Sequence, residues 1–235
     1  MCNLYTQKSG PKALMALSSA STSSVGNLET GNVYPDYQAP IIRNGDDGGR
    51  ELALARWGMP SSRKAIFEAA TKRADKLRAK GNEVDFDHLL KMEPDSGTTN
   101  VRNTTSRHWQ PWLAPEHRCL VPFTAFSEPG RVDGKYTPVW FQLRSKEPDP
   151  IGFFAGIHLK DWEGVRKIKT GWERADLFAF LTTDPSEPVK SVHPKAMPVI
   201  LTEPDEIEAW MTQPWDEIKG LQRALPAGSL VVKSG

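Results

Sequence analysis

The first residues that could do chemistry stand at the start of the chain, which reads MCNLY. If Met1 is removed, Cys2 carries a thiol and a free α-amine on neighbouring carbons. The unperturbed pKa is about 7.7 to 8.0 for such an amine and about 8.5 for a thiol, so both groups can act as nucleophiles near neutral pH. An aldehyde would form an imine with the amine and then close to a thiazolidine with the thiol. A small, inert residue on a frayed terminus is the alternative interpretation.

Three polar residues stand in or beside apolar segments, where they are not expected. Asn100 lies in TTNVRNTT, Glu128 follows the apolar run of RCLVPFTAFSEP, and His193 precedes the apolar run of SVHPKAMPVIL. Each has a structural alternative, since Asn100 fits an ordinary turn, Glu128 fits a strand end before the turn PGRVDG, and a single histidine often has only a structural role.

Together with the chain start, these segments resemble the SOS response-associated peptidase (SRAP) family. Members of that family begin with Met-Cys and expose the cysteine as the mature N-terminus, which corresponds to Cys2. RCLVPFTAFSEP is similar to the family segment that carries a glutamate, in register with Glu128. TTNVRNTTSR resembles its Asn-Ala-Arg-x-Glu segment and places Asn100 and Arg102, and SVHPKAMPVIL resembles its His-x-Arg-Met-Pro-Val-Ile-Leu segment and places His193.

Three further segments match the family less closely. NVYP gives Pro35, RWGMP gives Trp57, and DLFAFLTTD gives Thr182. The matches run in family order from residue 2 to residue 201, which covers most of the chain.

The resemblance implies a protein that recognises abasic sites in single-stranded DNA and links itself to them covalently. The ring-opened sugar of such a site carries an aldehyde, which Cys2 would capture as a thiazolidine. Glu128 would deprotonate the α-amine, His193 would protonate the sugar ring oxygen, and Asn100 would orient the terminus. The family is also described as releasing its own Met1, although a methionine aminopeptidase could do the same.

The other matched residues are expected to contact DNA. Arg102 would hold a phosphate, and Trp57 or Pro35 would stack on or wedge against exposed bases, while Thr182 belongs to the strand before the histidine. Lys195 stands near the position of the usual arginine after His193 and could serve as a weaker point charge.

The chain departs from the family pattern at several positions. Asn3 and Leu4 replace the usual Gly and Arg, Pro129 replaces a Trp after the glutamate, and Thr104 replaces an acidic residue. These changes affect the expected DNA-binding surface rather than the aminothiol of Cys2.

Two other functions are compatible with the same residues. An N-terminal-cysteine amidohydrolase would use the thiol of Cys2 against an amide and would need an oxyanion hole. A non-catalytic module could instead hold single strands through a basic helix and the tryptophans. The first predicts turnover of small amides, and the second predicts no covalent adduct.

Composition indicates the cellular compartment of the protein but does not indicate its activity. The chain has 235 residues, 30 Lys and Arg against 29 Asp and Glu, and a formal charge of +1, so bulk charge does not indicate a polyanion binder. Two cysteines, Cys2 and Cys119, form no disulfide framework or zinc pattern, which favours a reducing cytoplasm, with nucleoid association during DNA damage. We expect no metal, cofactor, membrane segment or protein partner, and a monomer whose ligand is single-stranded DNA containing abasic sites.

The elements that must position these residues are predicted from periodicity. Helices are expected at 11–18, 62–81, 85–92, 203–212 and 214–225, with Ser61 or Ser62 as a cap and Gly81 as a stop. Strands are expected at 39–44, 51–59, 118–126, 137–144, 151–159, 176–183, 197–201 and 229–233, the first two as a hairpin. Because helices are interspersed without βαβ regularity, the chain predicts one α+β domain over 1–235 around an antiparallel, barrel-like sheet with peripheral helices, including a helical insertion at about 62–92.

Overall fold

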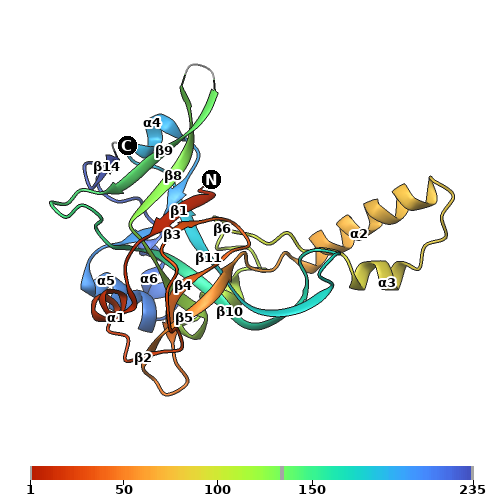
Figure 1. The fold of residues 1–235 in the computed structure, drawn as a ribbon, viewed down its shortest axis with the longest axis horizontal. Helices are drawn as coiled ribbons and strands as arrows, with labels where there is room; N and C mark the ends of the chain where they lie inside the picture. Colours follow the sequence, from red (N-terminus) through yellow and green to blue (C-terminus); the bar gives the residue numbers. More distant parts are fainter. Residues whose placement is uncertain (1, 133–134, 234–235) are drawn as a thin grey trace.

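The computed structural model describes residues 2–132 and 135–233 and is built around a closed β-barrel (Figure 1). Strands β5, β4, β7, β10 and β11 pair in this order, and a short parallel pairing of β11 with β5 closes the ring. Their bounds are β4 Gln38–Asn44, β5 Arg50–Trp57, β7 Arg118–Phe123, β10 Gly152–Val165 and β11 Trp172–Thr183. Short strands extend this sheet: β2 Thr22–Ser23, β6 Asn100–Val101, β12 Met197–Pro198 and β13 Ile200–Leu201.

A second, antiparallel sheet contains the start of the chain. Its strand order is β14-β9-β8-β1-β3, so β1 lies between β8 and β3. The strands are β1 Leu4–Gln7, β3 Gly31–Val33, β8 Ala125–Val132, β9 Lys135–Leu143 and β14 Leu230–Val232. Pairing of Leu4 with Ser127 and of Tyr5 with both Phe126 and Val33 fixes the register of β1. The residues before Leu4 are therefore held beside the middle of β8.

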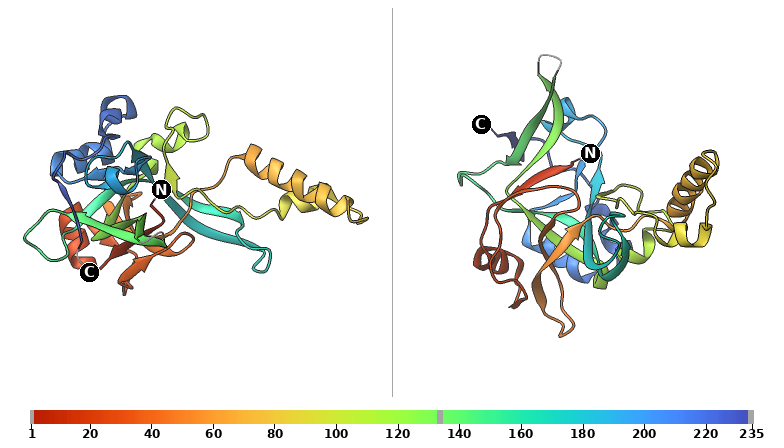
Figure 2. Two further views of the ribbon diagram at one scale, coloured as in Figure 1. Left: turned by 90° about the horizontal axis from the view of Figure 1, so that it is seen from above. Right: turned by 45° about the vertical axis from the view of Figure 1, so that its right-hand side comes forward.

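Most helices lie at the periphery, and one pair protrudes as an arm (Figures 1 and 2). The helices are α1 Pro11–Ser18, α2 Arg63–Arg78, α3 Phe86–Lys91, α4 Val189–Val192, α5 Pro204–Thr212 and α6 Trp215–Ile218, with 3-10 turns η1 Gln110–Leu113, η2 Pro115–His117 and η3 Lys219–Leu221. The arm consists of α2 and α3 and corresponds to the predicted insertion. The side chain of Ser62 caps α2 by accepting a hydrogen bond from the Ala65 amide.

Both faces of the barrel strands are buried, which explains their nearly continuous apolar sequences. One face joins the second sheet in a cluster that contains Tyr5, Trp57, Phe126, Phe154 and Phe180. The other face packs under α1, α5 and α6, where Trp210 is fully buried. This arrangement confirms the predicted α+β fold with a barrel-like sheet. Among the described residues, no helix is long and apolar enough to cross a membrane.

Several predicted boundaries are wrong. The run 118–126 contains two strands of different sheets, and β8 continues through Pro129 and Gly130, where a turn was expected. Proline is tolerated there because β1 pairs with β8 only from Ala125 to Ser127, so Pro129 lies on a free edge. The run 197–201 splits into two short strands, and the helix expected at 214–225 ends after one turn and continues as η3.

Candidate functional site

Cys2 lies in the protein interior, immediately before β1. Its side chain is fully buried, and its thiol donates a hydrogen bond to the Leu4 carbonyl over an S–O distance of 3.6 Å. The Cys2 carbonyl accepts a hydrogen bond from Nδ2 of Asn100 at 2.9 Å. The cysteine is therefore held from two sides, by its own strand and by a residue almost one hundred positions away. This position contradicts the alternative of a frayed terminus.

Asn100 is positioned by the barrel. It lies in β6, which pairs in parallel with β11 at Phe180, and it is 8% exposed. Its Nδ2 also donates to the Thr99 hydroxyl at 2.8 Å, which fixes the amide plane. The amide oxygen Oδ1 is buried and has no hydrogen-bond partner among the described residues. Asn100 thus binds the Cys2 carbonyl and still presents an acceptor.

Glu128 and His193 form a pair next to the same strand. Glu128 lies in β8 and is 1% exposed, while His193 follows α4, which packs on β8. The distance from His193 Nδ1 to Glu128 Oε2 is 3.6 Å, and Nδ1 also lies 2.9 Å from the Ala196 carbonyl. Since that carbonyl can only accept a hydrogen bond, this contact requires the proton on Nδ1. The other ring nitrogen, Nε2, then accepts a proton when the ring is neutral and donates one when the ring is charged.

Burial changes the acidity of the two central groups. Burial raises the pKa of Glu128 to about 7, so this carboxyl can both accept and release a proton near neutral pH. Burial, followed by the nearby Glu128 carboxyl, raises the pKa of the Cys2 thiol well above its ordinary range. The sequence-based expectation that this thiol ionises by itself near neutrality is therefore wrong in this environment. Thiol attack here needs a base, and Glu128 is adjacent.

A hollow opens beside this group. It has a volume of about 290 Å³ and is lined by Asn3, Leu4, Ser127, Glu128, Pro129, Tyr136, Thr137 and Pro138. This volume is at the lower end of the ~300–1,000 Å³ range of ligand pockets, which suits a ligand no larger than a sugar. The structure therefore brings Cys2, Asn100, Glu128 and His193 together next to a small cavity.

Two residues expected to contact DNA are instead buried. Trp57 is 1% exposed, packs against Tyr5 and Phe180 at ring-centroid distances of 5.2 Å, and donates from Nε1 to the Thr99 carbonyl at 3.0 Å. Its large ring fills the core, so the expectation that Trp57 stacks on bases is wrong. Thr182 is also 1% exposed and pairs with Pro198, so its side chain cannot reach a DNA strand.

Three other predicted contacts lie at the surface. Pro35 and Lys195 are exposed. Arg102 is also exposed and binds the Asp184 carboxylate at 2.5 Å and the Lys195 carbonyl at 3.3 Å. A phosphate would have to compete with Asp184 for this guanidinium. The expected processing site, Met1, lies outside the described residues.

One residue that organises the site is missing from the sequence-based prediction. Gln222 donates from Nε2 to the carbonyls of Arg102 and Thr182, at 2.9 and 3.0 Å, and accepts from the Thr104 hydroxyl at 2.9 Å. It thereby joins the segment after Asn100 to β11. The sequence gives no signal for this role because Gln222 stands in a polar stretch that reads as a solvated helix. Over residues 2–132 and 135–233, no cluster of three His, Cys, Asp or Glu residues could hold a metal.

Comparisons with known proteins identify one family and several solved structures with a similar fold. A family model described as "SOS response associated peptidase (SRAP)" matches residues 1–232. No curated protein matches the chain. Crystal structures with a similar fold include a protein from Bacteroides thetaiotaomicron, which is 20% identical with a TM-score of 0.66 and covers 98% of this chain and 90% of its own.

Two proteins from Bordetella bronchiseptica are also similar. One is 22% identical with a TM-score of 0.62 and covers 98% of this chain and 97% of its own. The other, described as phage-related, is 19% identical with a TM-score of 0.61 and covers 98% and 92%. At these identities, the solved structures support the fold alone.

Proposed function

Since the chain belongs to the SOS response-associated peptidase family, we propose that it captures abasic sites in single-stranded DNA through Cys2. After removal of Met1, the α-amine and thiol of Cys2 react with the aldehyde of the ring-opened sugar to form a thiazolidine. The protein could remove Met1 itself, with Glu128 and its neighbours helping Cys2 attack the preceding peptide bond. Removal by an aminopeptidase would leave the same terminus.

The observation that carries this proposal is the set of proton-transfer groups around Cys2. Asn100 holds the Cys2 carbonyl at 2.9 Å, and its Oδ1, which has no partner among the described residues, offers an acceptor for the liberated amine. Glu128, with a pKa raised to about 7 by burial, can take a proton from that amine. Without such a base, the buried thiol of Cys2 would stay protonated and unreactive.

The reaction then proceeds in balanced steps. His193 in its charged form gives a proton to the ring oxygen and takes up the proton of the anomeric hydroxyl as the sugar opens, and the amine of Cys2 adds to the aldehyde carbon to give a carbinolamine. Loss of one water gives the imine, with Glu128 giving a proton to the leaving hydroxyl and accepting the proton that leaves the nitrogen. The thiol adds to the imine carbon and its proton passes to the nitrogen, so one aldehyde and one aminothiol give one thiazolidine and one water. Each assisted proton transfer contributes a rate factor of roughly 10² to 10⁴.

The exposed positions Pro35, Arg102 and Lys195 would contact the strand next to the lesion. Arg102 would exchange its ion pair with Asp184 for a phosphate, which makes this contact sensitive to salt.

A crosslinking gel tests this function. The mature protein, incubated with a single-stranded oligonucleotide that carries one abasic site, should give a heat-stable shifted band that intact DNA does not give. Cys2→Ala should abolish the band, and Cys2→Ser should give only an imine that borohydride traps. Cys119→Ala is the matched control, because it removes the other buried cysteine and should leave crosslinking intact.

The assisting residues are tested in the same assay. Asn100→Ala and His193→Ala should slow crosslinking by at least about tenfold, whereas Lys190→Ala, an exposed change on the neighbouring α4, should not. A wild-type protein that forms no adduct but hydrolyses small amides would replace this proposal with the amidohydrolase. A protein that binds the strand without any covalent band would replace it with the non-catalytic module.

A further inference from the structure

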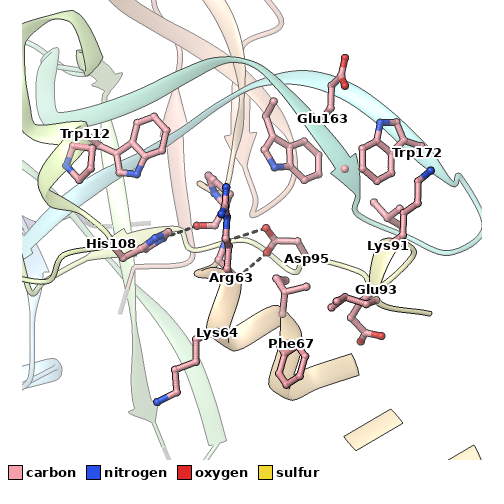
Figure 3. A pocket seen from close by; sticks show the side chains of 18 of the residues that line it. Arg63, Lys64, Phe67, Lys91, Glu93, Asp95, His108, Trp112, Glu163 and Trp172 are labelled. Carbon is pink, nitrogen blue, oxygen red and sulfur yellow. Dashed lines mark hydrogen bonds between the residues drawn. The ribbon is translucent and has the colours of Figure 1, made fainter. Parts of the chain in front are cut away.

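A large groove lies at the base of the helical arm, apart from the site around Cys2 (Figure 3). Its volume is about 1190 Å³, and its walls come from α2, α3, the segment that contains η1, and the β10–β11 hairpin. No residue of the proposed catalytic group lines it. The groove is therefore a separate feature that the proposed chemistry does not explain.

Aromatic side chains form much of the wall of this groove. Phe67 on α2 is 52% exposed and Trp172 on β11 is 51% exposed, although both are large apolar residues. Trp112 and Trp162 line the same groove. Lys91 Nζ lies 5.9 Å from the ring centre of Trp172, close enough for a cation–π contact. The groove thus offers accessible aromatic surfaces with a cation beside one of them.

Two of the three acidic residues in the groove lining already have a cationic partner. Asp95 accepts hydrogen bonds from the backbone and hydroxyl of Ser61, at 2.9 and 2.7 Å, and lies 3.6 Å from Arg166. Glu93 pairs with Arg73 at 3.4 Å. The third acid of the lining, Glu163, lies opposite Arg174 in the strand register, but Arg174 pairs with Asp161 at 2.9 Å, and Glu163 forms no ion pair with any described residue.

The basic residues of the lining are much less engaged. Arg63 and Arg107 form no ion pair with any residue that the structure describes, and Lys64 reaches Glu68 only at 3.8 Å with 85% of its side chain exposed. Figure 3 shows Arg63 and Lys64 on the arm side of the groove, with His108 and Trp112 on one flank and Trp172 on the other. Unneutralised cations beside exposed aromatic rings match a ligand with repeated negative charges and flat apolar faces.

The groove is also connected to the segments that carry the site. The chain runs from Asp95 in the groove to Asn100 at Cys2, and from Arg102 to Arg107 back in the groove, over five residues each time. The β10–β11 hairpin approaches the loop of Pro35 as well, since Lys167 binds Asp36 at 3.2 Å. A DNA strand that extends from the site around Cys2 in this direction would meet the groove.

We infer that this groove binds the single-stranded DNA that flanks the lesion. The identification of its polyanionic ligand as DNA rests on the proposed function. Arg63, Lys64 and Arg107 contact phosphates, and bases stack on Trp172 and Phe67. Single-strand binders use this combination of a cationic groove and aromatic platforms. An acidic peptide shares the charge, but it would not account for two exposed rings or for the connection to the site.

Fluorescence anisotropy with a lesion-free single-stranded oligonucleotide tests the inference on the full chain. Lys64→Glu and Arg107→Ala should weaken binding equally for different base sequences. Arg107→Ala should reduce the slope of log K against log salt by about 0.7, the value for one phosphate contact on a single strand. Trp172→Ala should weaken binding by about tenfold, within the range for loss of one stacked base. Lys146→Ala, an exposed charge change in the loop after β9, is the matched control and should change neither quantity.

Crosslinking separates this inference from the proposed function. At saturating abasic oligonucleotide, the groove variants should crosslink as fast as wild type, because Cys2 and its neighbours are unchanged. If Lys64→Glu, whose exposed position leaves the fold intact, binds the oligonucleotide as tightly as wild type does, the inference is overturned. It is also overturned if an acidic peptide binds the groove and the oligonucleotide does not. Failure of wild type to crosslink would instead overturn the proposed function, and the anisotropy result would stand.

Discussion

Replacement of Glu128 by Gln should stabilise the folded protein at alkaline pH while it slows the reaction. Glu128 is 1% exposed, and burial raises its pKa from 4.5 to about 7. The unfolded chain ionises this carboxyl near 4.5, so between the two values the folded state binds more protons. Stability from this group is fully present below about pH 4.5 and is lost as pH rises through about 7.

The size of the effect follows from the two pKa values. At 1.36 kcal/mol for each unit of pKa difference, the wild-type protein should lose about 3 kcal/mol of unfolding free energy from this carboxyl between about pH 4 and about pH 8. Glutamine has a similar shape and no charge to bury, so the variant avoids the loss. A chain of this size shifts its melting temperature by about 2–4 °C per kcal/mol. The difference in melting temperature between variant and wild type should therefore grow by about 6–12 °C over this range.

Thermal or urea unfolding of both proteins at a series of pH values measures this difference, in which all other titrating groups cancel. Glu29→Gln, a change of the same kind at an exposed loop position, is the matched control and should alter stability by no more than about 0.5 kcal/mol. The same Glu128→Gln protein should crosslink at least about a hundredfold more slowly than wild type at neutral pH. If the difference in unfolding free energy between Glu128→Gln and wild type stays constant with pH, the argument that burial disfavours the ionised carboxyl of Glu128 is refuted.

Two further changes test other parts of the structure. Trp57→Ala should destabilise the protein by about 3–5 kcal/mol in urea unfolding because it empties the centre of the aromatic cluster. Trp57→Phe should crosslink at the wild-type rate at saturating DNA. A large loss of this rate in a folded Trp57→Phe protein would restore a stacking role for this residue. His158 is 2% exposed and burial lowers its pKa to about 3, so its stability contribution is present above pH 6.5 and is lost as pH falls toward 3. When the pH is lowered from neutral to about 5, the unfolding free energy of His158→Leu should rise by about 2 kcal/mol relative to that of wild type. If unfolding experiments in acid show no such relative rise, this prediction is contradicted.

The sequence was informative where a residue type is needed for chemistry or where a pattern is local. The segments around Cys2, Asn100, Glu128 and His193 predicted four side chains that the fold brings to one place. The hairpin of β4 and β5 and the capped helix α2 follow from short-range periodicity and turn residues, and both are confirmed.

Features that depend on distant parts of the chain could not be predicted in this way. Trp57 stands in a segment that matches the family, but only the packing of Tyr5 and Phe180 around its ring places it in the core. Pro129 resembled a turn because the sequence does not reveal that β1 stops pairing at Ser127. The raised pKa of Glu128 likewise comes from the neighbours that bury it, not from its position in the sequence.

The position of β1 between β8 and β3 has a consequence for biosynthesis. The partners of β1 are β3, which follows within about thirty residues, and β8, whose Ala125–Ser127 segment is separated from it by about 120 residues. Asn100 and Glu128 are also far from Cys2 along the chain. Cys2 therefore reaches its native surroundings only once the chain has been made through β8. Under the proposed function, completion of folding replaces the ordinary reactivity of an exposed aminothiol with one that depends on Glu128, because burial raises the pKa of the thiol.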